Sequence, residues 1–205
     1  MSSSIFFKNK NKGFTLIELI VVMSIAMVVM TSLVIQQSKW NDNLAVSTQA
    51  YEMALMIRQA RVFALAVWEN TAGTGDKFDV AYGVDFDIDN PTWYVFFVDK
   101  PPRNQKYDVG EEIETKTLTR GVTINKICAF IPPKEKCSDL GSLNEIPIIF
   151  FRPSLNASSR FLSSSGGDIA SFGPPAFIYL VSPQGKTFFV KVEANGQVSI
   201  SQFTP

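Results

Sequence analysis

The sequence predicts an α+β protein in which a long N-terminal helix packs on an antiparallel β-sheet domain. Three observations predict this fold. Residues 14–35 are apolar with a single charge, no glycine or proline occurs between Gly13 and Gly73, and short alternating segments separated by turn signals fill most of the remaining chain. A length of 205 residues suits one ordinary domain with an appendage.

Residues 1–13 form a short basic leader. Lys8, Lys10 and Lys12 lie within five positions, and no acidic residue precedes Glu18. Positive charge beside a membrane span stays on the cytoplasmic side. We therefore expect a single-pass protein of the cytoplasmic (inner) membrane with a cytoplasmic N-terminus and a periplasmic or extracellular C-terminal domain.

Residues 14–35 are predicted to cross the membrane as a helix. These 22 residues would span roughly 33 Å, against a hydrocarbon core of about 30 Å. The one charged side chain, Glu18, would cost about 2.5 to 3.5 kcal/mol if it were ionised inside hydrocarbon. An interaction that offsets this cost is therefore expected at Glu18.

Residues 36–72 are predicted to continue the helix outside the membrane, because the stretch is rich in helix formers. Apolar residues recur there at helical spacing and form one stripe, which consists of Leu44, Tyr51, Leu55, Val62 and Leu65. A second set widens this stripe and consists of Met53, Ala54, Ile57, Ala60, Ala64 and Ala66. A helix that is apolar on most sides packs against more than one partner, so we expect docking on the domain and on neighbouring subunits.

Residues 73–205 are predicted to form a β-rich domain outside the membrane. The segment 78–88 alternates in polarity, and 146–151 is almost continuously apolar. Asn195-Gly196 is among the strongest short hairpin signals. Repeated hairpins of this kind indicate an antiparallel meander, folded into two packed layers.

Asp85 and Asp87 are the acidic pair that most invites a catalytic interpretation, since glycosidases use two carboxylates. Both alternate with apolar residues along a predicted strand. We therefore expect them on a solvent-exposed face of the sheet.

The composition excludes several classes of function. The sequence contains no histidine, which excludes Ser-His-Asp and Cys-His catalysis and any His-ligated metal site. It contains no P-loop, GxGxxG or CxxC motif, so we do not expect an enzyme. Basic and acidic residues number 19 each, and the chain without its leader has 16 basic residues, so a nucleic-acid partner is not expected.

The N-terminal segment resembles a known family. A leader that bears lysines ends in Gly13, and Phe14-Thr15-Leu16-Ile17-Glu18 opens the membrane span. This arrangement is similar to the class III signal of type IV pilins and type II secretion pseudopilins. The resemblance implies that a membrane-embedded prepilin peptidase cleaves between Gly13 and Phe14 and methylates the new amino terminus.

The resemblance also implies a role for Glu18 in assembly. Cleavage would create an α-amino group at Phe14, one helical turn from Glu18 and on the same side of the helix. In a growing fibre, the amino group of a neighbouring subunit would pair with Glu18 and offset the burial of both charges. The alternative is that Glu18 only snorkels to the membrane interface.

The helix-then-strands plan and the closing segment 178–201 look like the GspH/FimT group of minor pilins and pseudopilins. This resemblance implies a structural subunit that primes assembly or sits at a fibre tip. Its expected partners are the prepilin peptidase, other pilins or pseudopilins through the N-terminal helix, an inner-membrane assembly platform and membrane lipid. The sequence leaves open a type IV pilus, a secretion pseudopilus or a competence fibre. The alternative function is a DNA- or ligand-binding minor pilin of a competence pilus.

Cys128 and Cys137 lie nine positions apart. In the oxidising compartment outside the cytoplasmic membrane we expect them to form a disulfide. Closing so short a loop contributes roughly 2 to 3 kcal/mol in the chain-entropy model. The alternative is two free thiols, and either state would be structural.

A charged loop around residues 99–112 offers oxygen ligands of the kind that Ca²⁺ prefers. The candidates are Asp99, Asn104, Asp108 and Glu111. Their spacing does not match an EF-hand, and Lys100, Arg103 and Lys106 interrupt them. We therefore expect a solvated hairpin loop without a cofactor, with calcium as the weaker alternative.

Overall fold

The computed structural model describes residues 13–66, 80–132, 134–138, 143–151, 156–169 and 172–203, with only the backbone described at 35–39. The chain divides into two compact units, Met1–Trp40 and Asn41–Pro205. Each unit is described by itself below.

The first unit consists of the N-terminal part of one helix, α1 (Leu16–Leu65). Its stretch Leu16–Val34 is long and apolar enough to cross a membrane, and none of it is buried. The exposure of a continuous apolar stretch distinguishes it from the core helix of a soluble domain. The first unit therefore has the features expected of a membrane-spanning helix.

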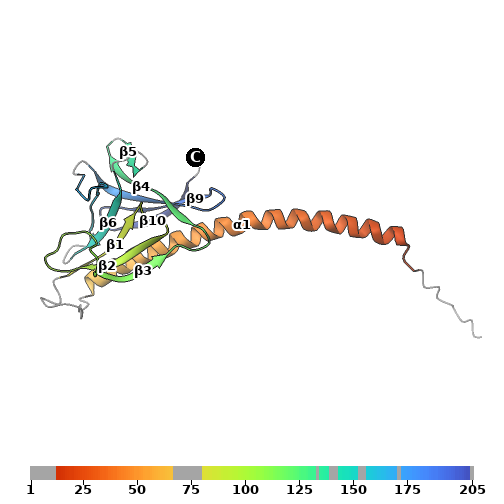
Figure 1. Ribbon diagram of the computed structural model, residues 1–205, viewed down its shortest axis with the longest axis horizontal. Helices are drawn as coiled ribbons and strands as arrows, with labels where there is room; N and C mark the ends of the chain where they lie inside the picture. The colour runs from red at the N-terminus through yellow and green to blue at the C-terminus, as the bar shows by residue number, and fades with distance from the viewer. Residues whose placement is uncertain are drawn as a thin grey trace, which may run out of the picture. The chain divides into compact units, whose positions relative to one another are not determined.

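The second unit contains two five-stranded antiparallel sheets (Figure 1). Sheet A has the order β3-β2-β1-β6-β7, and sheet B has the order β10-β9-β8-β4-β5. The strands are β1 (Ala81–Asp87), β2 (Trp93–Asp99), β3 (Glu112–Thr117), β4 (Thr123–Ile131), β5 (Lys134–Cys137), β6 (Glu145–Phe150), β7 (Ala157–Ser159), β8 (Gly173–Val181), β9 (Thr187–Val192) and β10 (Val198–Phe203). The α+β class predicted from the sequence is confirmed.

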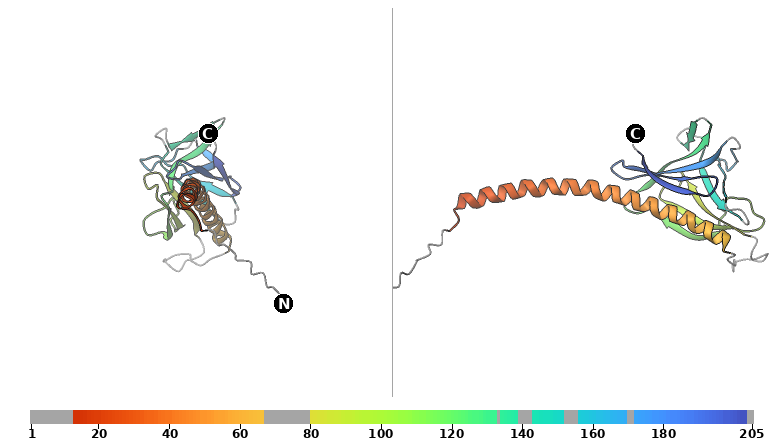
Figure 2. Two further views of the ribbon diagram at one scale, coloured as in Figure 1. Left: turned by 90° about the vertical axis from the view of Figure 1, so that its right-hand side faces the viewer. Right: turned by 180° about the vertical axis from the view of Figure 1, so that it is seen from behind.

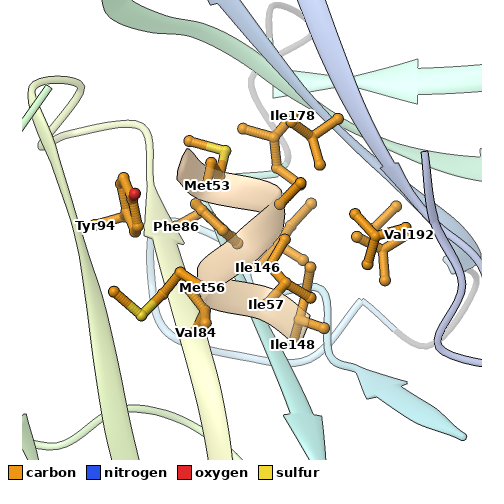
Figure 3. Packing of buried hydrophobic residues seen from close by; sticks show 14 of the residues in the cluster. Met53, Met56, Ile57, Val84, Phe86, Tyr94, Ile146, Ile148, Ile178 and Val192 are labelled. Carbon is orange, nitrogen blue, oxygen red and sulfur yellow. The ribbon is translucent and has the colours of Figure 1, made fainter. Parts of the chain in front are cut away.

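The outer half of α1 forms the centre of the core in this unit. Met53 and Ile57 are fully buried, and Figure 3 shows them between side chains of sheet A, such as Phe86, and side chains of sheet B, such as Ile178 and Val192. Figure 2 shows the same part of the helix running along the two sheets. The helix thus joins the two layers through one hydrophobic core.

The face of α1 that docks is the face with the smaller side chains. Its buried members are Ala45, Val46, Ala50, Met53, Ala54, Met56, Ile57, Ala60 and Ala64. The stripe of larger residues identified in the sequence (Leu44, Tyr51, Leu55, Val62 and Leu65) is exposed along its whole length. Alanines allow the helix backbone to approach the sheets closely, which explains why the face with fewer large side chains is the buried one.

Polar contacts fix the helix in place along the domain. Arg58 donates from Nη2 to the carbonyl oxygen of Val198 (3.0 Å), and the backbone N–H of Thr119 donates to Oε1 of Gln49 (3.3 Å). Ser182 donates to the carboxylate of Asp42. The helix ends at Leu65, and Ala66 lies in a turn. Residues 67–72 of the predicted extension lie outside the described residues.

The outer face of sheet A is covered, contrary to the expectation from its alternating pattern. The loop between β2 and β3 lies over this face. There the rings of Tyr107 and Phe97 meet edge to face, with their centroids 5.8 Å apart. Asp85, predicted to be solvent-exposed, is therefore buried with only 4% of its surface accessible. Two residues before Asp85, position 83 requires a glycine, because a Cβ there would lie 2.9 Å from the carbonyl oxygen of Ile148.

Truncation of a side chain should destabilise the domain strongly on the buried face of α1 and only slightly on the exposed face. Ile57→Ala should lower the free energy of unfolding of the domain by about 2 to 5 kcal/mol, because it opens a cavity between the sheets. Leu55→Ala, at a side chain that is 64% exposed, should change it by less than about 0.5 kcal/mol. Urea unfolding of the full chain in detergent micelles measures both. Equal losses for the two variants would contradict the assignment of the buried face.

Candidate functional site

The candidate processing site lies where α1 begins. Gly13 precedes the helix in an exposed position, and no atom lies within 4 Å of the place that a Cβ would occupy. Phe14 follows with 82% of its surface exposed. The bond between Gly13 and Phe14 is therefore exposed ahead of the first helical residue. The rest of the predicted leader, residues 1–12, lies outside the described residues.

Thr15 and Glu18 form the first turn of the helix together. The carbonyl oxygen of Thr15 accepts the backbone N–H of Leu19 at 3.2 Å, which makes Thr15 the N-cap. The backbone N–H of Glu18 donates to Oγ1 of Thr15 (3.3 Å), and this hydroxyl lies 3.5 Å from Oε2 of Glu18. The bond to the Glu18 N–H is one half of a capping box, whereas the Glu18 carboxylate contacts the Thr15 hydroxyl and not its backbone N–H.

The capping role was missed in the sequence analysis, although Thr-x-x-Glu before an apolar run is its sequence signature. It gives Glu18 a function within its own helix, in addition to the predicted contact with a neighbour. The positive end of the helix dipole also favours a carboxylate at this position. The contacts with Thr15 supply no cation, so they do not offset the cost that an ionised carboxylate would have in hydrocarbon.

Cys128 and Cys137 are joined by a disulfide. The two residues lie directly opposite each other on β4 and β5, with their Cα atoms 4.0 Å apart. The aromatic rings of Phe177 and Tyr179 pack against the bridge, which attaches the short edge strand β5 to sheet B. Glu135 completes the one close group of potential metal ligands in the described part of the chain, but the sulfurs are bonded to each other and are not available as thiolates.

Of the four calcium candidates, Asp99 ends β2 and the other three lie in the loop that covers sheet A. All four make hydrogen bonds within this segment. The two carboxylate oxygens of Asp99 accept the backbone N–H groups of Asn104 (3.2 Å) and Gln105 (3.0 Å). Glu111 accepts the backbone N–H groups of Lys100 (2.9 Å) and Asp108 (3.2 Å). The side chain of Asn104 donates to Asp108. Within the described residues, these oxygens do not converge on one point, so the loop stabilises its own backbone.

Beneath this loop, Asp85 and Glu145 form a pair of carboxyl groups. Burial, followed by the negative charge of Glu145, raises the pKa of Asp85 well above its usual value. Burial also raises the pKa of Glu145, which shares a hydrogen bond with Asp85. One oxygen of Asp85 has no partner among the described residues. The pair therefore favours a bound proton. Local sequence patterns did not predict this pair, because the loop that covers it lies further along the chain.

Comparison with known proteins agrees with the signal at the N-terminus. Residues 8–34 match the family model described as the prokaryotic N-terminal methylation motif. No curated protein and no solved structure matches the chain.

The motif supports a type IV pilin-like or pseudopilin-like protein, a structural class rather than an enzymatic one. It implies processing by a prepilin peptidase and assembly with other pilins. The exposed apolar helix near the N-terminus fits a membrane-anchored protein of this class.

The acidic pair predicts an unusual dependence of stability on pH. Folding raises the pKa of Asp85, so the folded state favours the protonated carboxyl group. The resulting stabilisation of the folded state is complete below the unfolded pKa of about 3.9. This contribution is lost as pH rises through the raised folded value. Asp85→Asn should therefore flatten the fall in the free energy of unfolding as pH rises above the unfolded pKa of about 3.9. Urea unfolding across this range measures the change, with Asp89→Asn in the exposed turn as a matched control. Parallel curves for wild type and Asp85→Asn would refute this role.

Proposed function

We propose that this chain is a minor subunit of a type IV pilus or of a type II secretion pseudopilus. A prepilin peptidase cleaves it between Gly13 and Phe14 and methylates the new amino terminus. The helix stays in the cytoplasmic membrane until the subunit enters a fibre. The β domain then acts outside the membrane, in priming assembly or at the fibre tip.

The observation that carries this proposal is the position of Glu18 relative to Gly13. Glu18 is the fifth residue after the proposed cleavage site, and it is the only charged residue in the apolar stretch Leu16–Val34. A secretory signal places its cleavage site after the apolar stretch. Here the glycine precedes it, as the class III signal requires.

The chemistry of the mature N-terminus supports pairing with Glu18. Cleavage exposes an α-amino cation at Phe14, and both charges then enter an environment where neither is solvated. Opposite charges about 4 Å apart attract several times more strongly in such a medium than in water. When helices pack side by side, the amino group of one subunit therefore stabilises the carboxylate of its neighbour.

The charges and the disulfide support the proposed orientation. Lys8, Lys10 and Lys12 favour a cytoplasmic leader. The bridge between Cys128 and Cys137 suits a domain outside the cytoplasmic membrane, where disulfides persist.

Contacts with other pilins would extend from the membrane half of α1 to the exposed stripe of its outer half. In that stripe Tyr51 and Leu55 are each 64% exposed, and Val62 is 57% exposed. Contiguous apolar residues of this kind mark interaction surfaces. The assembly platform in the inner membrane and membrane lipid are the further partners of the unassembled subunit.

Nucleic-acid binding, the alternative function, receives less support. Phosphate contacts by lysine and arginine dominate such binding. On the closing strands, Lys191 forms an ion pair with Glu193 at 2.5 Å. From the helix α1, Arg58 donates to the carbonyl oxygen of Val198 and Arg61 donates to that of Gly196. These three cationic side chains therefore bond to groups of the same chain, which makes them less suited to contact phosphates.

Processing provides the first test. The full chain expressed with a prepilin peptidase should lose residues 1–13 and acquire one methyl group, as read from the mass of its N-terminal peptide. Gly13→Val should abolish cleavage. The space around Gly13 is open, so the change does not disturb the fold and isolates recognition by the peptidase.

Gly173→Val supplies the control, since no atom lies within 4 Å of a Cβ at that glycine either. This variant should be cleaved as wild type. An intact leader in the wild-type chain, or cleavage after Ile35, would overturn the proposed function.

A further inference from the structure

The strand β3 forms one end of sheet A, and among the described strands β2 is its only neighbour in the sheet. Its pairing with β2 is regular from Glu114 to Thr117, and all of its residues except Glu114 are exposed. The other edge of such a strand presents N–H and C=O groups that can pair with a strand of another chain. This edge belongs neither to the processing site nor to the exposed stripe of α1, so the proposed function does not use it.

The register with β2 identifies the backbone groups of β3 that point outward. Leu118, directly after the strand, donates its N–H to the carbonyl oxygen of Thr92 on the β2 side (2.8 Å). Successive residues of an antiparallel strand alternate between directing both backbone groups to the neighbouring strand and directing both away from it. Lys116 therefore bonds to β2 as Leu118 does, while Thr115 and Thr117 direct their N–H and C=O groups outward.

The charges along β3 change sign in the direction of the chain. Glu112 and Glu114 come first, Lys116 follows, and Arg120 lies in the turn after the strand. Lys116 forms an ion pair with Glu114 in the same strand, and the two side chains are still 46% and 43% exposed. Charges on an edge strand commonly prevent pairing with other chains. An antiparallel strand of the same sequence, however, would bring acidic residues against basic ones, whereas a parallel copy would bring like charges together.

We propose that β3 pairs antiparallel with β3 of a second copy of this chain, about a two-fold axis at Thr115. Thr115 then exchanges two backbone hydrogen bonds with Thr115 of the second copy, and sheet A continues from one copy into the other. Glu114 lies directly opposite Lys116 of the second copy, so the ion pair within each strand becomes part of a network of four charges.

The charges select this register over its neighbours. Side chains that lie opposite each other across a sheet share one face, so the strand can shift only in steps that place Glu114 or Lys116 on the two-fold axis. Either shift sets two like charges directly opposite each other, which is destabilising. The register centred on Thr115 is also the one in which the outward backbone groups of Thr115 meet their own kind.

Disulfide trapping in the full chain tests the pairing. The Cα atoms of such a hydrogen-bonded pair lie about 5.5 Å apart, which a disulfide can span. Thr115→Cys in detergent micelles should therefore form covalent dimers under mild oxidation. Gln202→Cys is the matched control, because Gln202 is exposed on β10, the edge strand of sheet B. The dimer yield of Thr115→Cys should exceed that of the control at least tenfold.

Exchange of charges tests the register. In the Thr115→Cys chain, Glu114→Lys alone or Lys116→Glu alone sets like charges opposite each other, so each should lower the dimer yield at least fivefold. A mixture of the two variants places opposite charges together again and should restore the yield. Because each chain in the mixture still carries one charge substitution, restoration cannot result from repaired folding. The urea midpoint of each variant reports whether it folds.

A dimer yield of Thr115→Cys no higher than that of Gln202→Cys would overturn the proposal, and it is the result expected if this edge serves a different subunit or is only protected by its charges. Equal yields for the folded single variants and the Thr115→Cys chain, or a mixture that restores nothing, would also overturn it. Trapping uses the unprocessed chain, so its failure and the failure of the proposed function are separate results.

Discussion

The carboxylate of Glu18 in an otherwise apolar helix surface is the constraint on which the N-terminal half of this protein depends. Every side chain described in Leu16–Val34 is exposed, so the protein itself buries none of them and offers Glu18 no cationic partner there. The contacts with Thr15 bond the first turn of the helix but bring no cation to the carboxylate. Hydrocarbon makes that charge costly. In the proposed function, removal of the leader creates an amine four residues away. The cation proposed to pair with Glu18 would therefore exist only after cleavage, which would link processing to assembly.

The outer half of α1 has two different faces. One face forms the centre of the core of the β domain, and the other is an exposed apolar surface. The face rich in alanine enters between the two sheets, where Met53 and Ile57 are the larger anchors. The larger side chains of the stripe, such as Tyr51 and Leu55, remain outside. Close approach through small residues gives a dense core, while the opposite face leaves apolar area exposed, the surface proposed to contact other subunits. A domain attached through the larger face would have had to accommodate more side-chain volume and would have left little for assembly.

Local patterns in the sequence predicted the helix, the antiparallel strands, the two layers and the disulfide pair, because hydrophobic periodicity, turn residues and cysteine spacing are local properties. The same patterns did not predict which face of the helix docks or that the outer face of sheet A is covered, and both have a physical reason. Both sides of residues 44–65 are apolar, so periodicity alone could not distinguish the side that docks from the exposed stripe. Asp85 was expected in solvent because its strand alternates, but a loop from residues 100–111 covers that face. That loop is held by its own backbone contacts to Asp99 and Glu111, a network that spacing does not encode.

Entry into fibres tests most directly whether Glu18 acts between subunits or only within its own helix. Three variants separate the two roles, measured as the amount in sheared fibres relative to the amount in membranes. Glu18→Gln keeps a residue able to complete a capping box but removes the charge, Glu18→Leu removes both, and Thr15→Val removes the cap and keeps the carboxylate. Loss of one partner of a buried pair costs about 3 to 5 kcal/mol, whereas loss of a cap costs about 1 kcal/mol. Both Glu18 variants should therefore be inserted and cleaved yet fall at least tenfold in fibres, while Thr15→Val stays near wild type. Normal entry of Glu18→Gln together with poor entry of Thr15→Val would show that the residue serves its own helix and not the neighbouring subunit.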